Sequence, residues 1–309
     1  MLLNGQINNK KMKKNTNILF GYTLVASTAL FTAFSYILAK KVSNDLYPET
    51  VAFYWFFGAF LTACFKRAIF AFFGTNFRVP ISALYKYREL MVFSSLITVF
   101  GVAFWVIALR TVGPPVTSFL MKFQVVFSVL LGTIFLNEKL RKLEIFGIIL
   151  TIIGGMVITF DTSSFELRGS LFAIFSALCY SCLFFIVRKK GNNLNMMMVA
   201  TLRSLGVSII VIIYLVLFGK FQFPSYEDLI FMLIGGTCGA YIGKALQFQA
   251  IKLVDISRTT AITPLEGVFV VLLTMVFFDT VPSTIKLIGG TLIMIGVIFL
   301  LIFRKEKLN

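Results

Sequence analysis

Histidine is absent from the sequence, and charged residues are scarce. Without histidine the chain cannot build a Ser-His-Asp or Cys-His nucleophile system, a His-ligated zinc or haem site, or an HExxH metalloprotease centre. Charged residues make up 14% of the 309 residues, against roughly a quarter in soluble domains, whereas 58% are hydrophobic. These absences exclude a soluble single-core protein and most hydrolase mechanisms.

Cysteine is also rare, and all four copies lie inside apolar stretches. Such cysteines are typical of small hydrophobic residues buried in a membrane rather than of a disulfide framework. Cys179 and Cys182 form a CxxC pair, but a metal site would need two more ligands and no histidine is available. We therefore expect no metal, no redox role and no cofactor.

Long apolar runs fill most of the chain. A helix needs about 20 apolar residues to cross a hydrocarbon core of about 30 Å. Ten segments approach this length, and the connections between them are too short for a soluble domain. The expected spans are 18–39, 48–65, 90–109, 115–136, 143–160, 169–187, 196–218, 229–251, 256–278 and 285–303. The sequence thus predicts an all-α integral membrane protein with ten transmembrane helices, which acts inside the bilayer or at its surfaces.

The first apolar run begins after four lysines and superficially resembles a signal peptide. The run from Ile18 to Ala39 is longer than the 7–15 residues of a signal-peptide core, and Lys40 and Lys41 follow it. We therefore expect a retained first span, preceded by a tail at residues 1–17. Met12 is a second candidate for the start of the protein.

Lysine and arginine are distributed unevenly between alternate connections. One side carries 20 of them and the other only six, which are Lys40, Lys41, Arg110, Arg168, Lys220 and Lys286. The positive-inside rule places the richer side in the cytoplasm, with both termini, and predicts a multi-pass protein of a bacterial inner membrane. The net charge of +16 is then explained by membrane topology, and we expect no nucleic-acid partner.

The sequence repeats itself at an offset of 142 residues. The matched pairs include Val126 with Val268, Phe127 with Phe269, Phe135 with Phe277, Gly147 with Gly289, and Gly154 with Gly296. Spans 1 and 6 match less well, at an offset of 148. Each copy holds five expected spans, an odd number, so the second copy must enter the membrane from the opposite face. We expect two inverted repeats at 18–160 and 161–303, a plan that recurs in secondary transporters, and a tail at 304–309.

Particular motifs in both copies resemble a known family. The segment Ala108–Gly154 has AlaLeuArgThrValGly ahead of a span and AsnGluLysLeu at 137–140 after it, and it looks like the first half of an EamA-type member of the drug/metabolite transporter superfamily. Its counterpart Ala250–Gly296 resembles the second half. The resemblance implies a ten-span carrier of amino acids, amines, nucleotide-linked or other metabolites. Lys122 departs from the repeat, since the second copy has Pro264 there.

Four charged residues lie deep within the expected spans, away from their ends, namely Lys122, Arg203, Lys244 and Glu266. A charge near the bilayer centre costs about 2.5–3.5 kcal/mol, so such residues are candidates for function. Glu266 falls near the midplane, and Gln124 is its partner in the repeat. We predict that Lys122, Gln124 and Glu266 form one polar cluster that binds substrate. In the alternative interpretation, Lys122 and Glu266 are a buried pair that only holds the two halves together.

Three further residues are candidates for the same cavity. Lys244 continues a ladder of small residues, Gly236 and Ala240, at a spacing that brings helices close together, so we expect it to face protein rather than lipid. Trp105 and Tyr241 are candidates for stacking on a substrate ring, although aromatic belts explain most tryptophans in membrane proteins. Arg203 matches a position where the family often has arginine, and we expect a structural role for it.

The four buried charges sum to a surplus of two positive charges. This favours an anionic or zwitterionic substrate, such as an amino acid, a carboxylate or a nucleotide-like compound. Glu266 is the expected proton-coupling residue, because burial disfavours its charged form. We predict a secondary active transporter that works by alternating access, is not an enzyme, and acts as a monomer or homodimer on a small molecule with protons as coupling ion. The alternative is an integral-membrane enzyme for a lipid or polyprenyl substrate, but the loops offer only isolated carboxylates, which are Asp161, Glu166, Glu227 and Asp228.

Overall fold

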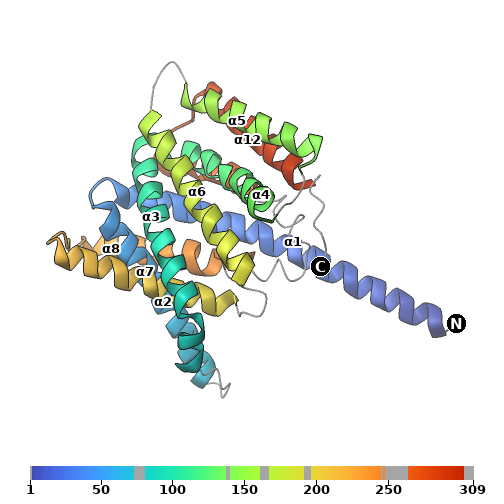
Figure 1. The fold of residues 1–309 in the computed structure, drawn as a ribbon, viewed down its shortest axis with the longest axis horizontal. Helices are drawn as coiled ribbons and strands as arrows, with labels where there is room; N and C mark the ends of the chain where they lie inside the picture. The colour runs from blue at the N-terminus through green and yellow to red at the C-terminus, as the bar shows by residue number, and fades with distance from the viewer. Residues whose placement is uncertain are drawn as a thin grey trace.

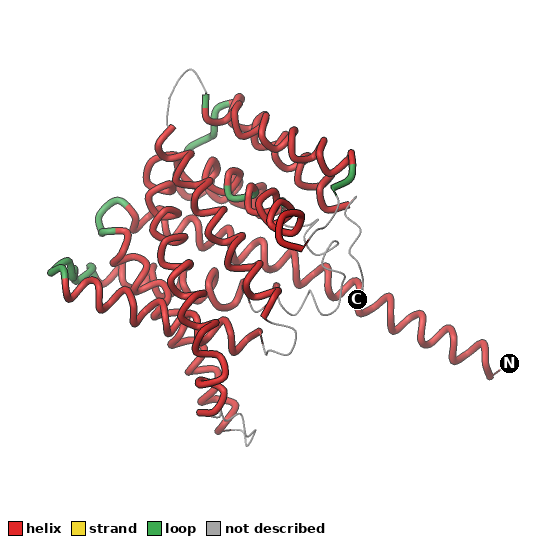
Figure 2. The backbone as a smooth tube through the Cα atoms, in the orientation of Figure 1, coloured by secondary structure: helices red, strands yellow, loops and turns green. Residues whose placement is uncertain are grey.

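The computed structural model describes residues 2–72, 81–136, 140–160, 167–190, 196–244, 246–247 and 264–302. All regular secondary structure in these ranges is helical (Figures 1 and 2). The elements are α1 (Leu2–Ser43), α2 (Pro48–Phe72), α3 (Ile81–Leu120), α4 (Phe123–Leu136), α5 (Lys142–Thr159), α6 (Leu167–Lys190), α7 (Met196–Leu217), α8 (Tyr226–Gly235), the π-helix η1 (Gly236–Gly243), α11 (Leu265–Phe278) and α12 (Thr284–Ile302).

Several of these helices have the length and composition of membrane spans. Six helices are long and apolar enough to cross a membrane, within Thr23–Ser43, Arg88–Leu120, Lys142–Thr159, Leu167–Ile186, Met198–Leu217 and Thr284–Ile302. Two shorter apolar helices lie at Phe123–Phe135 and Leu265–Phe278. The all-helical, multi-pass prediction is confirmed at this level. The expected tail at 1–17 is continuous with the first span, since α1 runs unbroken from Leu2 to Ser43.

The boundary that the sequence predicts between the spans 90–109 and 115–136 coincides with a break inside α3. The backbone at Gly113 is not helical, so α3 consists of two helices that meet at a kink, and the second of them ends at Leu120. Gly113 marks the kink with φ 76° and ψ 170°, a conformation that glycine adopts without steric cost, and Pro114 and Pro115 follow it. The Thr117 hydroxyl donates to the Gly113 carbonyl at 2.7 Å. Because Pro114 has no N–H, the Arg110 carbonyl loses its helical donor, and Lys40 Nζ donates to it instead at 3.1 Å. The chain therefore changes direction here without a loop.

The predicted span 115–136 is interrupted in its interior. Helix α3 ends at Leu120 and α4 begins at Phe123, with Met121 and Lys122 in a turn between them. The backbone N–H of Lys122 donates to the carbonyl of Phe119, and that of Val125 to the carbonyl of Lys122, both three residues back, as in a 3₁₀ turn. The apolar run gives no sign of this break, which is why the sequence predicted one continuous helix.

The repeat at an offset of 142 recurs in the helix boundaries. Helix α4 spans 123–136 and α11 spans 265–278, while α5 begins at residue 142 and α12 at residue 284. The short helices therefore match at both ends and the long helices at their starts, and both short helices begin at the residue after a turn.

Helices α5 and α12 lie side by side and contact each other through glycines (Figure 1). A Cβ added to Gly147 would lie 2.7 Å from the Gly296 carbonyl oxygen, and one added to Gly154 would lie 2.6 Å from the Gly289 carbonyl oxygen. The helices are thus antiparallel and in backbone contact. The pattern is reciprocal, because Gly147 is the repeat partner of Gly289, and Gly154 of Gly296. A local two-fold axis produces such a pattern.

Several helix ends meet at one end of the bundle, and the sequence assigns all of them to the side of the membrane with few lysine and arginine residues. Lys40 Nζ donates to the Arg110 carbonyl at 3.1 Å. The Tyr47 N–H donates to Gln222 Oε1 at 2.8 Å. These contacts join α1, the start of α2, the kink of α3 and the connection before α8, as alternate connections in a membrane bundle require.

Candidate functional site

A buried ion pair joins the turn before α4 to the first turn of α11. Lys122 Nζ lies 3.0 Å from Glu266 Oε2, and the two side chains are only 7% and 16% exposed. The sequence predicted that these residues approach each other, and the structure brings them together. Both interpretations of the pair, as substrate site and as lock, involve this contact, so the distance alone does not separate them.

The broken helices place this pair inside the protein. Lys122 lies in the turn at Met121–Lys122, and Glu266 is the second residue of α11, after Pro264. Gln124 is the second residue of α4 and is half-buried, so it has the same place in the first repeat as Glu266 has in the second. Helix N-termini carry partial positive charge, and the ends of α4 and α11 therefore favour negative groups at this point.

Aromatic side chains from three helices lie beside Glu266. The Tyr36 and Trp105 ring centroids are 5.1 Å apart, and those of Trp55 and Trp105 are 5.8 Å apart, both edge to face. Tyr36 interacts electrostatically with Glu266 and has a side-chain hydrogen bond with Trp105. The predicted Trp105 is thus connected to the ion pair through Tyr36. Sequence reasoning missed Tyr36, since nothing in its neighbourhood distinguishes it from other tyrosines within spans.

A second cationic group lies next to the ion pair, on α7 and at the end of η1. Arg203 is 7% exposed, its guanidinium lies 5.6 Å from the Phe56 ring centroid, and its Nε has no hydrogen-bond partner. The half-buried Lys244 places its Nζ 5.0 Å from the Phe184 ring centroid and 3.1 Å from Gln247 Oε1. Lys244 is also within electrostatic range of Arg203, Glu266 and Lys122. Lys122, Arg203, Lys244 and Glu266 therefore belong to one region.

The small-residue ladder before Lys244 packs as close helix contacts require. A Cβ on Gly236 would collide with the Trp55 backbone, and one on Gly239 would lie 2.5 Å from Ser35 Oγ. These glycines let η1 approach α1 and α2, and Lys244 faces Phe184 of α6 rather than lipid, as the sequence predicted.

Tyr241 is not connected to the charged region by any contact that the described residues show. It is buried, and Lys66 Nζ lies 6.0 Å from its ring centroid, while Cys64 is a further electrostatic neighbour. It therefore lies against the second half of α2. A role for Tyr241 in substrate binding stays a prediction.

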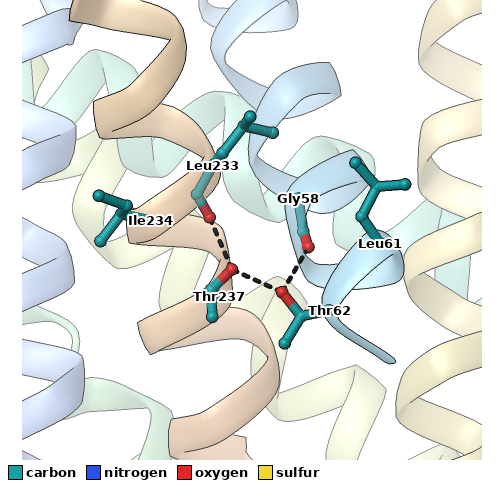
Figure 3. Close-up of a pocket in the computed structure, with 6 residues that line it drawn as sticks. All are labelled: Gly58, Leu61, Thr62, Leu233, Ile234 and Thr237. Atoms are coloured by element: carbon teal, nitrogen blue, oxygen red, sulfur yellow. Dashed lines mark hydrogen bonds between the residues drawn. The ribbon is translucent and has the colours of Figure 1, made fainter. Parts of the chain in front are cut away.

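A groove of about 240 Å³ lies between α2 and the α8–η1 segment (Figure 3). Its lining residues are Gly58, Leu61, Thr62, Leu233, Ile234 and Thr237. The two threonine hydroxyls are hydrogen-bonded to each other at 2.7 Å, and each also lies within hydrogen-bond distance of a carbonyl of its own helix, that of Gly58 or of Leu233 (Figure 3). Since each hydroxyl has one proton, one of them donates to the other and the second donates to its carbonyl. Since these hydroxyls already have partners, the groove offers an apolar surface and is not the candidate site for a charged substrate.

The described residues contain no group of three or more His, Cys, Asp or Glu side chains that could hold a metal ion. Cys179 and Cys182 are free thiols. Of the carboxylates considered for an enzyme, Asp161 and Glu166 lie outside the described residues. Asp228 interacts with Ser225 at the N-terminal cap of α8, where the hydroxyl accepts from its backbone N–H at 3.2 Å. That carboxylate has a structural role at a helix end.

Comparison with known proteins gives the same family as the motifs. The EamA-like transporter family model matches residues 19–160 and 167–302. The S-adenosylmethionine uptake transporter of Rickettsia conorii is 24% identical over 298 residues, which cover 94% of this chain and 93% of that protein. The uncharacterized transporter YxxF of Bacillus subtilis is 26% identical over 189 residues, which cover 60% of each chain and so less than two thirds of that relative.

A solved crystal structure has a similar fold, with a TM-score of 0.64 and 17% sequence identity over 92% of this chain and 97% of the other. The family match covers nearly the whole chain, and the relatives carry transporter names. The apolar helices make this a multi-pass membrane protein. This chain therefore belongs to the EamA-like transporter family.

Proposed function

We propose that this protein is a secondary active transporter of a small anionic or zwitterionic metabolite, and that it works by alternating access around Lys122 and Glu266. The observation that carries the proposal is the 3.0 Å ion pair between the turn before α4 and the first turn of α11. These two segments are equivalent in the 142-residue repeat. A buried pair at the junction of two equivalent, interrupted helices is where transporters with inverted repeats bind their substrates and ions.

The proposal includes two inverted five-helix repeats, with both termini in the cytoplasm of the inner membrane. The reciprocal contacts of Gly147 with Gly296 and of Gly154 with Gly289 support it, because an in-plane two-fold axis relates such pairs. The uneven distribution of basic residues supports the orientation. Exchange of conformation between the two halves would then open the region of the ion pair to one side and the other.

Glu266 is the proposed proton-coupling residue. Proton binding at Oε2 would remove the negative charge that Lys122 faces at 3.0 Å, and the attraction between the α4 and α11 ends would be lost. A cationic group of the substrate could compete with Lys122 for the same carboxylate. In both cases a charged ligand changes the ion pair between the equivalent helix ends, so binding and conformational change become coupled.

S-adenosylmethionine is the first substrate to test. One relative is named an uptake transporter of this compound, and the alignment covers nearly all of both chains. S-adenosylmethionine carries a carboxylate, an ammonium and a sulfonium group together with an adenine ring. Although its net charge is positive, its amino-acid group is a zwitterion, whose carboxylate could bind the cations of the region and whose ammonium could bind Glu266, while the aromatic cluster could hold the sulfonium.

The test is uptake of labelled S-adenosylmethionine into proteoliposomes containing the purified protein, with and without a pH gradient. We expect saturable uptake that the pH gradient changes. Glu266→Gln should remove the effect of the gradient while some exchange at equal pH remains, and the exposed Glu227→Gln is the matched control that should behave as the parent. A Glu266→Gln variant with the parent's response to pH would refute the proposed coupling residue.

A further inference from the structure

We propose that Arg203 and Lys244 form an anion-binding subsite for the carboxylate of the transported substrate, next to the Lys122–Glu266 pair but distinct from it. This inference rests on the proposed transport function. It changes the role of Arg203, for which the sequence predicted structural packing, and it assigns the anion to cations other than Lys122.

The distribution of charge is the first argument. Lys122 has Glu266 as its partner at 3.0 Å. Within the part of the chain that the structure describes, Arg203 and Lys244 have no carboxylate within 4.0 Å, although each is close enough to the other to interact electrostatically. Two neighbouring cations away from water repel each other and favour an anion between them. The surplus of positive charge in this region therefore lies at Arg203 and Lys244.

The unused hydrogen-bonding capacity of Arg203 is the second argument. Its side chain is more than nine-tenths buried, yet Nε has no hydrogen-bond partner. A purely structural buried arginine normally has its N–H groups satisfied. The guanidinium presents a planar fork that matches a carboxylate, while the lysine ammonium adds a second positive charge.

Helix α6 gives the subsite an aromatic wall. Tyr180 and Phe184 are one helical turn apart, so they share a face of α6. Tyr180 interacts with Arg203, and Lys244 Nζ lies over the Phe184 ring. Aromatic faces hold cations in place without neutralising them, which leaves both charges available to a ligand. Because Lys244 is also in range of Glu266, a zwitterion can place its anion here and its cation at Glu266.

The first experiment measures thermal unfolding of the purified full-length protein in detergent without ligand. Lys244→Met removes one of two repelling cations, so we expect its melting temperature to rise above that of the parent. Lys122→Met is the matched control, since it removes a paired cation and leaves Glu266 buried without its partner, and its melting temperature should fall. A fall for Lys244→Met comparable to that of Lys122→Met would show a structural cation and overturn the subsite.

The second experiment compares S-adenosylmethionine with its decarboxylated analogue, which lacks only the carboxylate. Lys244→Met and Arg203→Met should each lose at least tenfold in affinity for S-adenosylmethionine and change little toward the analogue. Arg203→Lys, which keeps the charge, should lose less. Equal losses for both compounds would overturn the inference. If neither compound shifts the melting temperature of the parent, S-adenosylmethionine is the wrong substrate, and the comparison without ligand still decides the subsite.

Discussion

Breaking the Lys122–Glu266 pair from one side should cost far more stability than removing both of its charges. At 3.0 Å the attraction is about 5 kcal/mol for an effective dielectric constant of about 20. Burial of the two groups opposes this gain, so the net contribution of the intact pair is near zero. Removal of one partner leaves the other buried and unpaired, which costs about 3–5 kcal/mol.

We therefore expect Lys122→Met to lower the free energy of unfolding by about 3 kcal/mol or more, and Lys122→Met with Glu266→Gln to recover most of that loss. The assay is a double-mutant cycle on the purified protein, with unfolding in detergent followed by intrinsic fluorescence. Trp105, two contacts away from Glu266 through Tyr36, is one of the two tryptophans that report on this region. The argument fails if the double variant is as unstable as Lys122→Met alone, because the cost would then arise from lost packing rather than from an unpaired charge.

Three further predictions concern topology, packing and the aromatic cluster. The topology is tested in a variant whose four native cysteines are replaced by serine. In intact cells a cysteine introduced at Pro224 should react with an impermeant thiol reagent, and one introduced at Lys189 should not. Labelling at Lys189 would contradict the proposed orientation. Gly154→Leu should reduce the yield of folded protein, measured by size-exclusion chromatography, because its Cβ alone would lie 2.6 Å from the Gly289 carbonyl oxygen, whereas the exposed Met156→Leu on the same helix should be tolerated. Trp105→Phe keeps an aromatic ring but loses the hydrogen bond to Tyr36. Transport should therefore weaken, and the KM in uptake assays should rise more than it does in the control variant Phe104→Leu. Equal rises of the KM in the two variants would show that Trp105 does not belong to the site.

The sequence contains enough information to predict the ion pair but not the helix breaks around it. Lys122 and Glu266 could be paired in advance because a buried charge stands out against apolar residues, and because the repeat aligns Gln124 with Glu266. The interruption at Met121–Lys122 could not be predicted, since hydrophobicity alone does not distinguish a continuous helix from two helices joined by a tight turn. The boundary that the sequence predicts between the spans 90–109 and 115–136 is found at Gly113, where the structure has a kink.

The partners of the charged residues depend on side-chain packing, which sequence periodicity does not describe. Tyr36 and Tyr180 are interior residues here, but tyrosines in spans are equally common at membrane surfaces, so neither could be selected. Arg203 was assigned from its resemblance to family members, which says where arginine occurs but not whether its Nε has a partner.

The glycine contact between α5 and α12 also constrains how the protein is made. The two helices that meet through Gly147, Gly154, Gly289 and Gly296 are separated by the synthesis of more than 120 residues, since α5 ends at Thr159 and α12 begins at Thr284. At about 5–20 residues per second, α5 is complete roughly 6 to 25 seconds before translation reaches its partner. During that interval its narrow glycine face must be accommodated by lipid or by the insertion machinery. The contact closes only when the last helix of the chain has entered the membrane.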